Sequence, residues 1–349
     1  MIIAIDGPAG SGKSTTAKIV AEKLGFIHIN TGAMYRGITL KCLQQDINPD
    51  DIVKMEKILN ETAFQFGEKD VSQLCMNGKD ISSEITSTEV TESVSRFSAI
   101  PIVREKLVHY QREMAEGQDV VLEGRDIGTV VFPNADFKFF LIADIDERAR
   151  RRMKDMETKG EIITLEELIG ELSERDRKDS TREHSPLKKE EDAIEIDTAQ
   201  GTKEIFNYVD SHQITIENKV KIILDHFFNK SSKEIQGKSR GMIVVKTRKL
   251  CVQYFHEINR QLKERKSNFQ CLVGFSGEVI LDKGGEKYTE KGLNLSIGHD
   301  GDVPLGLKNP KYRLLVVANK FQTGFDEPML QSMYIDKSLK DVQCVKTLS

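Results

Sequence analysis

The stretch that decides the fold is Gly7-Pro8-Ala9-Gly10-Ser11-Gly12-Lys13-Ser14, which lies between a short apolar run at 2–5 and a helical apolar pattern over 14–24. It fits GxxxxGK[ST] at every required position, and the order strand, glycine loop, helix is typical of a P-loop. Backbone N–H groups of such a loop converge on phosphate oxygens, Lys13 reaches the β- and γ-phosphates, and the Ser14 hydroxyl can ligate Mg²⁺. The alternative, a glycine turn that only joins strand to helix, does not require Gly-Lys-Ser at this offset. The predicted ATP-binding residues are Gly7, Pro8, Ala9, Gly10, Ser11, Gly12, Lys13, Ser14 and Thr15.

Two further segments end on polar loops that we expect to face the P-loop. A short strand at 26–29 precedes Asn30-Thr31-Gly32-Ala33-Met34-Tyr35-Arg36, and a buried-type strand at 119–122 runs into Glu123-Gly124-Arg125-Asp126. In a parallel α/β sheet, ligands bind outside the carboxyl ends of the strands. An arginine beside a P-loop is well placed to hold a second phosphate, although Tyr35 and Arg36 also fit an ordinary amphipathic helix start.

Composition and length indicate a globular chain with more than one domain. The chain has 349 residues, 30% of them charged and 38% hydrophobic, and a formal net charge of -4. Residues 1–205 hold 28 Lys and Arg against 39 Asp and Glu, a net charge of -11, and residues 206–349 hold 23 against 16, a net charge of +7. This asymmetry suggests polyanion contact by the basic half, or an ordinary solvated surface.

The cysteines and the apolar runs bear on the compartment. Five cysteines are widely spaced and form no CxxC pair, which argues against a disulfide framework or a zinc site. No secretion signal and no run of about 18 apolar residues occurs, so we expect no membrane segment and a cytoplasmic protein.

Residues 1 to about 200 resemble bacterial cytidylate kinase. The resemblance rests on landmarks that occur in order along the chain. They are IDGPAGSGKST, NTGAMYR, SRFSAIPIVRE at 95–105, EGRDIGTVVFPNADFKFFLIA, the arginine run at 147–152, ERDRKDSTRE and DAIEIDT at 192–198.

The resemblance implies a central parallel sheet with a small nucleotide-monophosphate insert and a mobile lid. It also implies transfer of the γ-phosphoryl group of ATP to CMP or dCMP with Mg²⁺. Within the CMP site it implies cytosine contacts at Ser95, Arg104 and Asp126. The complete CMP-binding set that we predict is Thr31, Tyr35, Arg36, Ser95, Arg104, Arg125, Asp126, Arg175, Asp179 and Arg182. The predicted catalytic residues are Lys13, Arg125, Asp126, Arg148, Arg151 and Arg152.

The residue types suit this chemistry without the family name. A carboxylate such as Asp126 accepts from the exocyclic amine of cytosine, and Arg or Ser donors suit its ring acceptors. Arg148, Arg151 and Arg152 have the spacing of one helix face and could close over the transferring phosphoryl group, or form a solvated basic face. Asn77-Gly78, flanked by alternating apolar residues within 64–85, predicts a hairpin that fits the small insert.

The second half has a different pattern. A hinge at 199–202 precedes a helical stripe over 205–228, and 230–240 is polar and basic, which predicts a loop. Strands are predicted at 241–245, 270–275 and 312–318 and a helix at 250–262, which together indicate a second parallel α/β unit. The half contains no second GxxxxGKS.

Residues 206–349 resemble the second RecA-like motor domain of the type I restriction enzyme motor subunit. The stretches that carry this resemblance are IENKVKIILDHF, GMIVVKTRKLCVQYF, LVGFSGEV, GEKYTE and YRLLVVANKFQTGFDEPMLQSMYIDKSL followed by VQCVKTLS. In that family the TGFD stretch lies near ATP, and Thr323, Gly324 and Asp326 occupy its positions here. The first motor domain and the arginines of the last helicase motif are absent, so we expect neither motor nor nuclease activity.

We therefore predict an α/β chain made by fusion near 198–205. It comprises a P-loop nucleoside monophosphate kinase at 1–200, a linker and helix at 201–240, and a truncated helicase-like RecA lobe at 241–349. The predicted function is phosphorylation of CMP and dCMP by ATP, and the partners are these small molecules. The alternative is a DNA-binding or restriction-associated protein that uses its basic half.

Overall fold

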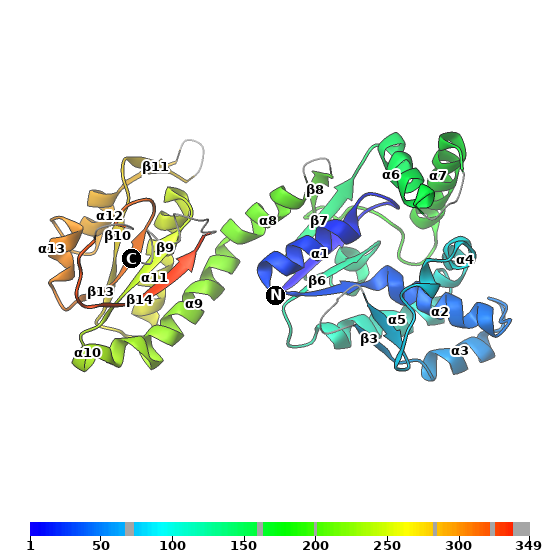
Figure 1. Cartoon of the computed structure of the whole chain (residues 1–349), viewed down its shortest axis with the longest axis horizontal. Coiled ribbons are helices and arrows are strands. Elements are labelled where there is room, and N and C mark those ends of the chain that lie inside the picture. The colour runs from blue at the N-terminus through cyan, green and yellow to red at the C-terminus, as the bar shows by residue number, and fades with distance from the viewer. Residues whose placement is uncertain (67–72, 159–162, 199–200, 282–284, 322–324, 338–349) are drawn as a thin grey trace. The chain divides into compact units, whose positions relative to one another are not determined.

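The computed structural model describes residues 1–66, 73–158, 163–198, 201–281, 285–321 and 325–337 (Figure 1). The chain divides into two compact units, Met1–Tyr208 and Val209–Ser349. We call them the N-terminal unit and the C-terminal unit. The boundary falls within the helix α8 (Gly201–Ser211).

The N-terminal unit is built on a five-stranded sheet in the order β2-β6-β1-β7-β8, and every neighbouring pair is parallel. Its central strand is the apolar run at the start of the sequence. The strands are β1 (Ile2–Asp6), β2 (Ile27–Asn30), β6 (Val120–Gly124), β7 (Phe137–Ile142) and β8 (Ile194–Asp197). Because β2 and β6 lie on one side of β1 and β7 and β8 on the other, the strand order reverses at β1. Ligands of open α/β sheets bind at such a switch point, which the P-loop occupies here.

Helices cover both faces of this sheet. One face is covered by α1 (Lys13–Leu24) and α8. These helices are in contact through Lys23 of α1, whose ammonium lies 5.1 Å from the ring centre of Phe206 of α8. On the other face, α5 (Pro101–Ala115) packs Ala115 against Val120 and Leu122. The alternation of core residues along β6 follows from the two-residue period of a strand.

A helical region beside the sheet forms the largest apolar core of the N-terminal unit. It consists of α2 (Thr31–Gln44), α3 (Ile52–Asn60), a 3₁₀ turn at Glu84–Thr86, α4 (Thr88–Ser98) and α5. The side chains of Met34, Ile38 and Met55 are fully buried within it. Asn30 caps α2 by accepting a hydrogen bond from the backbone of Ala33, so the polar turn after β2 is locked at the sheet edge.

The predicted hairpin at Asn77-Gly78 is confirmed. β3 (Phe64–Phe66), β4 (Leu74–Met76) and β5 (Lys79–Asp80) form a three-stranded antiparallel sheet, and the turn between β4 and β5 is Asn77-Gly78. Both turn residues have positive φ, 53° and 79°, as a two-residue hairpin of this type requires.

A pair of helices, α6 (Ile145–Glu157) and α7 (Leu165–Thr181), lies at the carboxyl end of the sheet (Figure 1). We call this pair the lid. Leu168, Leu172 and Ala149 form its buried core together with Ala9 of the P-loop. Thr164 and Glu167 form a capping box that fixes the start of α7.

The C-terminal unit contains a second all-parallel sheet, in the order β10-β13-β9-β14. Its strands are β9 (Arg240–Val245), β10 (Gln270–Gly274), β13 (Tyr312–Val317) and β14 (Leu330–Asp336). Every residue of β13 is buried, which is typical of a parallel strand with both faces covered. The parallel α/β unit predicted for this half is therefore confirmed.

Helices α9 (Gln213–Asn229) and α11 (Arg248–Glu264) pack on one face of the second sheet. The other face carries Val303 and Leu307 of α13 (Val303–Leu307). The remaining elements are a 3₁₀ turn at Ser231–Lys233, the short turn α10 (Glu234–Gly237), α12 (Glu290–Ser296) and the hairpin strands β11 (Glu278–Ile280) and β12 (Lys287–Thr289).

The helical stripe predicted over 205–228 is confirmed for α9, which carries its apolar residues, while the start of the segment belongs to a separate helix, α8. The break lies at His212, whose backbone is extended and whose Nδ1 accepts a hydrogen bond of 3.3 Å from the backbone N–H of Ile214. The His212 side chain caps α9 and separates the two helices, although the apolar residues on both sides keep their helical spacing. The segment 230–240, predicted as a loop, contains a 3₁₀ turn at Ser231–Lys233 and then the turn α10, in which Ile235 and Gln236 have positive φ of 51° and 55°.

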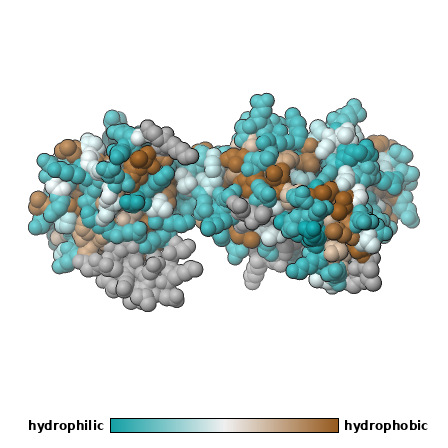
Figure 2. All heavy atoms as spheres, turned by 90° about the horizontal axis from the view of Figure 1, so that it is seen from above, coloured by the Kyte–Doolittle hydropathy of each residue, from teal (hydrophilic) through white to brown (hydrophobic). Residues whose placement is uncertain are grey.

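No helix of the described residues is long and apolar enough to cross a membrane. Figure 2 shows a mostly hydrophilic surface on the face in view, with hydrophobic residues in separate groups.

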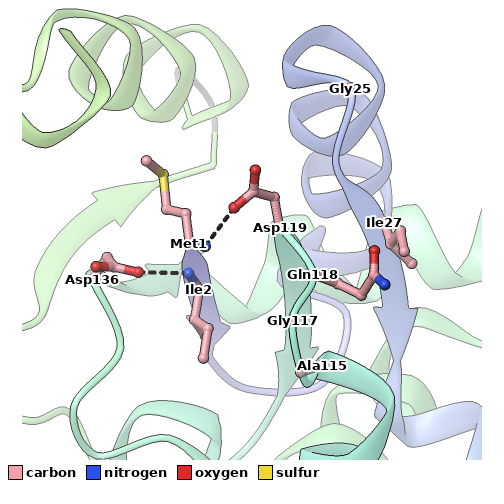
Figure 3. A pocket seen from close by; sticks show the side chains of 9 residues that line it. All are labelled: Met1, Ile2, Gly25, Ile27, Ala115, Gly117, Gln118, Asp119 and Asp136. Atoms are coloured by element: carbon pink, nitrogen blue, oxygen red, sulfur yellow. Dashed lines mark hydrogen bonds and ion pairs between the residues drawn. The ribbon is translucent and has the colours of Figure 1, made fainter. Parts of the chain in front are cut away.

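A shallow pocket lies at the amino end of the first sheet (Figure 3). Its polar groups are already used, because the N-terminal ammonium bonds Asp119 at 2.5 Å and the backbone N–H of Ile2 donates to Asp136 at 2.7 Å. It also lies at the end of the sheet opposite to the P-loop.

Candidate functional site

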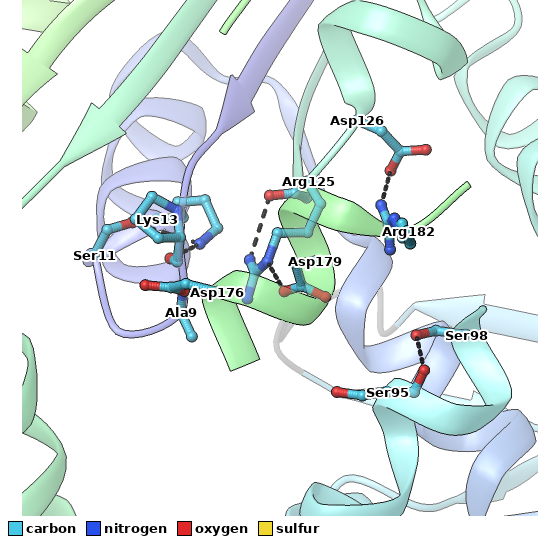
Figure 4. Close-up of polar contacts among 12 residues, drawn as sticks. Ala9, Ser11, Lys13, Ser95, Ser98, Arg125, Asp126, Asp176, Asp179 and Arg182 are labelled. Carbon is cyan, nitrogen blue, oxygen red and sulfur yellow. Dashed lines mark hydrogen bonds and ion pairs between the residues drawn. The ribbon is translucent and has the colours of Figure 1, made fainter. Parts of the chain in front are cut away.

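A cleft of about 620 Å³ lies at the carboxyl ends of β1, β2 and β6. It is lined by the P-loop, the start of α2, α4, the loop after β6 and the lid, and part of it is shown in Figure 4. The predicted site residues that line it are Ala9, Gly10, Gly12, Lys13, Ser14, Thr15, Thr31, Tyr35, Arg36, Ser95, Arg104, Arg125, Asp126, Arg151, Arg152, Arg175, Asp179 and Arg182. The structure therefore brings together residues from all over the first 182 positions.

The backbone of the P-loop has conformations that favour glycine at Gly7 and Gly12. Gly7 has a φ of 152°, and a Cβ there would lie 2.3 Å from the carbonyl oxygen of Leu141, so no other residue fits. Gly12 has a φ of 82° and precedes α1 without a side-chain cap, which leaves the N–H groups of the first turn facing the cleft. Pro8 and Ser11 complete the loop and accept hydrogen bonds from Lys13.

Lys13 is buried and folds back onto its own loop. Its Nζ donates to the carbonyl oxygen of Pro8 at 2.6 Å and lies 3.5 Å from the Ser11 hydroxyl (Figure 4). Burial and the neighbouring charge of Arg125 hold the pKa of Lys13 well below its usual range. A poorly solvated ammonium of this kind gains more from an anionic ligand than an exposed one would.

A buried acid that we had not predicted stands beside the P-loop. Glu123, near the end of β6, accepts a hydrogen bond from the Ser14 hydroxyl at 2.7 Å, and its other oxygen lies 3.2 Å from Nε2 of His28. Burial alone would raise the pKa of Glu123, but hydrogen bonds from His28 and Ser14 outweigh it and lower that pKa. The position of Glu123 at a strand end was the signal in the sequence that could have found it.

A second unpredicted acid, Asp6, ties β1 to the loop after β6. Its two carboxylate oxygens accept hydrogen bonds from the backbone N–H groups of Ile127, at 2.9 Å, and Gly128, at 2.8 Å. Burial raises the pKa of Asp6 to about 6 despite these bonds. Asp6 therefore holds the segment that carries Arg125 and Asp126 against the P-loop strand.

The three residues predicted at cytosine lie on one wall of the cleft. Arg104 and Asp126 form a buried ion pair, and Arg104 also donates to the carbonyl oxygen of Ser98 at 3.1 Å. Its guanidinium lies 5.4 Å from the ring centre of Tyr35. Ser95 lines the same cleft from α4. The wall thus offers a carboxylate, a guanidinium and a hydroxyl, as an amine-bearing heterocycle requires.

The cleft also contains buried polar atoms without hydrogen-bond partners. Within the described residues, the Tyr35 hydroxyl and the Nε atoms of Arg36 and Arg175 are buried and have no hydrogen-bond partner. Burial raises the pKa of Tyr35 to about 12, and burial together with the charge of Arg125 lowers the pKa of Arg175 to about 10. Buried polar groups are costly when unsatisfied, so these donors are arranged for an anionic ligand.

Arg125 and Arg182 form contacts between the loop after β6 and the end of α7. Nε of Arg125 donates to Asp179 of α7 at 2.9 Å, and Nη2 of Arg182 lies 3.9 Å from a carboxylate oxygen of Asp126 (Figure 4). Thr31 donates to the carbonyl oxygen of Glu123 at 2.7 Å, which ties the start of α2 to β6.

The three lid arginines have different surroundings. Arg152 lines the cleft and forms no ion pair within the described residues. Arg151 also lines it, bonded to Thr198 at 3.0 Å and to Glu147 at 2.9 Å. Arg148 is buried behind the P-loop and is not among the residues that line the cleft.

Two of the residues singled out in the second half, Thr323 and Gly324, lie outside the described residues. Asp326 is described and lies between β13 and β14, next to Glu327, whose carboxylate bonds Arg240 at the start of β9 at 2.5 Å. No group of three or more His, Cys, Asp or Glu side chains suited to a metal ion occurs in the described parts of the chain.

Comparison with protein families places two similarities on the chain. Residues 3–226 match the family model described as cytidylate kinase, and residues 282–349 match the one described as type I restriction enzyme subunit R domain 3. The first match continues past the predicted limit near residue 200, through α8 and into α9.

Curated relatives match the N-terminal part of the chain. A cytidylate kinase from Fusobacterium nucleatum is 48% identical over 211 residues, which are 60% of this chain and 95% of that protein. One from Caldanaerobacter subterraneus is 48% identical, covering 58% of this chain and 89% of its own length. One from Halalkalibacterium halodurans is 45% identical, covering 60% of this chain and 97% of its own length. A solved structure of an uncharacterised protein from Eubacterium ventriosum aligns at 18% identity over 61% of this chain and 99% of its own, with a TM-score of 0.35.

Proposed function

The chain belongs to the cytidylate kinase family, and from this premise we propose that its N-terminal unit transfers the γ-phosphoryl group of ATP to both CMP and dCMP. The N-terminal unit is a nucleoside monophosphate kinase. We also propose which residues bind the donor ATP, which bind the acceptor phosphate and which bind the cytosine ring. The observation that carries this assignment is the set of unpartnered cations that meet at the mouth of the P-loop.

Charge placement supports a phosphate acceptor between the P-loop and the lid. Arg36 and Arg175 are half-buried, and their Nε atoms are buried without a hydrogen-bond partner. Within the described residues they form no ion pair, and they line the same cleft as Lys13. A nucleoside monophosphate brings an anionic oxygen that needs positioning and charge neutralisation more than a general base. These arginines would orient that oxygen toward the donor, and Arg152 would stabilise charge that develops during transfer.

The donor phosphates fit the P-loop and the first turn of α1. The free N–H groups there and the Lys13 ammonium are the donors that a polyphosphate needs. The oxygens that would hold Mg²⁺ are the Ser14 hydroxyl and the Glu123 carboxylate, which already contact each other at 2.7 Å and suit a hard cation. When bound, Mg²⁺ supplies neutralisation of the charge on the donor phosphates.

Recognition of the base is assigned to the wall formed by Ser95, Arg104 and Asp126. Asp126 accepts from the exocyclic amine of cytosine, while Arg104 holds that carboxylate in place and donates to a ring acceptor. Uracil presents a carbonyl oxygen where cytosine has its amine, and a carboxylate repels it. This arrangement favours CMP over UMP.

For the C-terminal unit we propose a lobe, residues 241–349, without motor activity. Residues 206–349 contain no second GxxxxGK[ST], and the P-loop at residues 7–14 is used by the kinase cleft. A helicase lobe needs a P-loop on a facing lobe to hydrolyse ATP. We therefore infer a related fold, and not a related activity, from the similarity of residues 282–349 to a restriction subunit domain.

The test is an assay of ADP release by the full chain with CMP, dCMP, UMP, AMP and GMP. We expect turnover with both cytidine nucleotides and at least about tenfold lower kcat/KM with UMP, because one buried polar contact discriminates by that much or more. Equal rates with AMP, or no turnover with CMP, would exclude the proposed acceptor site. Turnover with CMP alone would remove dCMP from the proposal.

A further inference from the structure

The P-loop is held from behind by two lid residues that do not line the cleft. Arg148 of α6 donates through Nη1 to the carbonyl oxygen of Ala9 at 2.9 Å and to Oδ2 of Asp176 at 2.6 Å. The other carboxylate oxygen of Asp176, on α7, accepts from the backbone N–H of Ala9 at 3.3 Å. Both backbone polar groups of one P-loop residue are thus bound by one ion pair, and Figure 4 shows Asp176 beside Ala9.

This contact is largely shielded from water. Only 7% of the Arg148 side chain and 21% of the Asp176 side chain are exposed, and Ala9 is buried. The Ala9 side chain belongs to the apolar core of the lid, with Ala149, Leu168 and Leu172. Ala9 is therefore fixed to both lid helices by packing and by hydrogen bonds.

The pair also has an electrostatic consequence. A carboxylate placed against a loop that binds a polyphosphate repels that ligand, and the repulsion is strong where water is excluded. Arg148 neutralises Asp176 at 2.6 Å, so the carboxylate can bind the Ala9 N–H without opposing the anion. Loss of Arg148 alone would leave an uncompensated buried charge at the loop.

We propose that Arg148 and Asp176 are positioning residues that act as one neutral unit to hold the P-loop in its ATP-binding form. This assignment replaces the catalytic role predicted for Arg148, whose Nη1 is directed at a backbone carbonyl and at Asp176. It rests on the proposed function of the P-loop as the ATP site. The unit couples ATP affinity to the position of the lid, because its two members come from the two lid helices.

The experiment is a double-mutant cycle on the full chain with Arg148→Met, Asp176→Asn and the double variant. Affinity is measured without turnover by titration with a fluorescent N-methylanthraniloyl derivative of ADP, and kcat and the KM values for ATP and CMP are measured separately. Arg150→Met is the matched control, since Arg150 lies on the same helix and is exposed.

We expect Arg148→Met to weaken nucleotide binding by about 10- to 50-fold, as the loss of one partner of a buried pair does, with KM for CMP unchanged. The double variant should bind within about fivefold of wild type, because the unpaired carboxylate is gone. A double variant as weak as Arg148→Met would overturn the proposal, as would a fall confined to kcat. Inactivity of wild type and Arg150→Met with CMP would instead refute the proposed function, and leave the nucleotide titration to decide the inference.

Discussion

The two parallel sheets of this chain end differently at their carboxyl edges. In the C-terminal unit, Lys320 after β13 bonds Glu290 at 2.8 Å, and Asp336 at the end of β14 bonds Lys219 at 2.8 Å and the Tyr254 hydroxyl at 2.6 Å. In the N-terminal unit, Arg36 and Arg175 are half-buried at the corresponding edge, with buried Nε atoms, and form no ion pair among the described residues. At the positions compared, the charges of the second sheet edge are paired, whereas two arginines at the first sheet edge have no ion pair in the described part of the chain.

The difference shows what marks a ligand site in an α/β unit. The carboxyl ends of the strands mark only where a ligand can bind. Charged side chains that already form ion pairs with one another interact weakly with a ligand there. Buried cations without partners carry a free-energy cost that an anion can relieve. The comparison therefore predicts that removing an unpaired cation of the first cleft changes catalysis and that removing Lys320 at the second sheet edge does not.

The largest effect is expected for Lys13. Lys13→Ala should lower kcat/KM by about a thousandfold, because a preorganised donor to the transferring phosphates is lost. The measurement is steady-state ADP release with CMP at saturating ATP. Lys320→Ala is the matched lysine at the other sheet edge and should leave both kinetic constants unchanged. A comparable loss in Lys320→Ala would break the comparison.

The next effect tests an unpaired arginine on the acceptor side. Arg36→Met should lower kcat/KM for CMP by about a hundredfold and change KM for ATP little, since an anion contact made only to the acceptor is removed. Both constants are obtained by varying one substrate at a time. A rise in KM for ATP as large as that for CMP would place Arg36 at the donor instead.

A smaller effect is expected for the choice of base. Asp126→Asn keeps an oxygen for Arg104 but can no longer act as a charged acceptor for the amine of cytosine. The ratio of kcat/KM for CMP to that for UMP should fall about tenfold. Thermal unfolding of the variant controls for damage to the buried pair. An unchanged ratio in a folded variant would remove Asp126 from base recognition.

A pH effect is expected from Asp6. Its folded pKa, about 6, lies above the ordinary value of 3.8, so the folded state binds the proton more tightly than the unfolded state. The contribution of Asp6 to the free energy of unfolding is therefore complete below about pH 4 and is lost as pH rises through 6. Over this window it falls by roughly 3 kcal/mol.

Asp6→Asn has no such titration, so the stability of wild type relative to the variant should decline between pH 4 and pH 7. The measurement is urea unfolding across this range, following the transition that ADP shifts to higher urea. A constant difference between the two proteins would show that Asp6 does not titrate in this window.

The smallest effect concerns DNA. Because Lys320 and Lys219 at its sheet edge are held in ion pairs, we expect the C-terminal unit to give the full chain no salt-dependent affinity for duplex DNA. The measurement is fluorescence anisotropy of a labelled duplex between 50 and 200 mM salt. A steep linear fall of log affinity with log salt would show phosphate contacts and revive the DNA-binding alternative.

Much of the architecture followed from local patterns. The apolar run at 2–5, the turn at Asn77-Gly78 and the strand at 312–318 are each specified by residues next to one another, and the structure contains all three. The break at His212 did not follow, because a cap depends on one side chain while the apolar period continues around it. Glu123 is not among the predicted site residues, although its segment is expected to face the P-loop, and it reaches both Ser14 and His28.

By itself, the sequence determined which family the kinase resembles and predicted where phosphate binds, because the spacing of Gly7, Gly12, Lys13 and Ser14 is a local property of the backbone. Only the tertiary structure decided which arginines form ion pairs and which remain available to a ligand. Helical spacing puts Arg148 and Arg152 on one face of α6, but α7 brings Asp176 to Arg148 and leaves Arg152 in the cleft. Periodicity orders residues along one helix, whereas ion pairing depends on what another helix places opposite them.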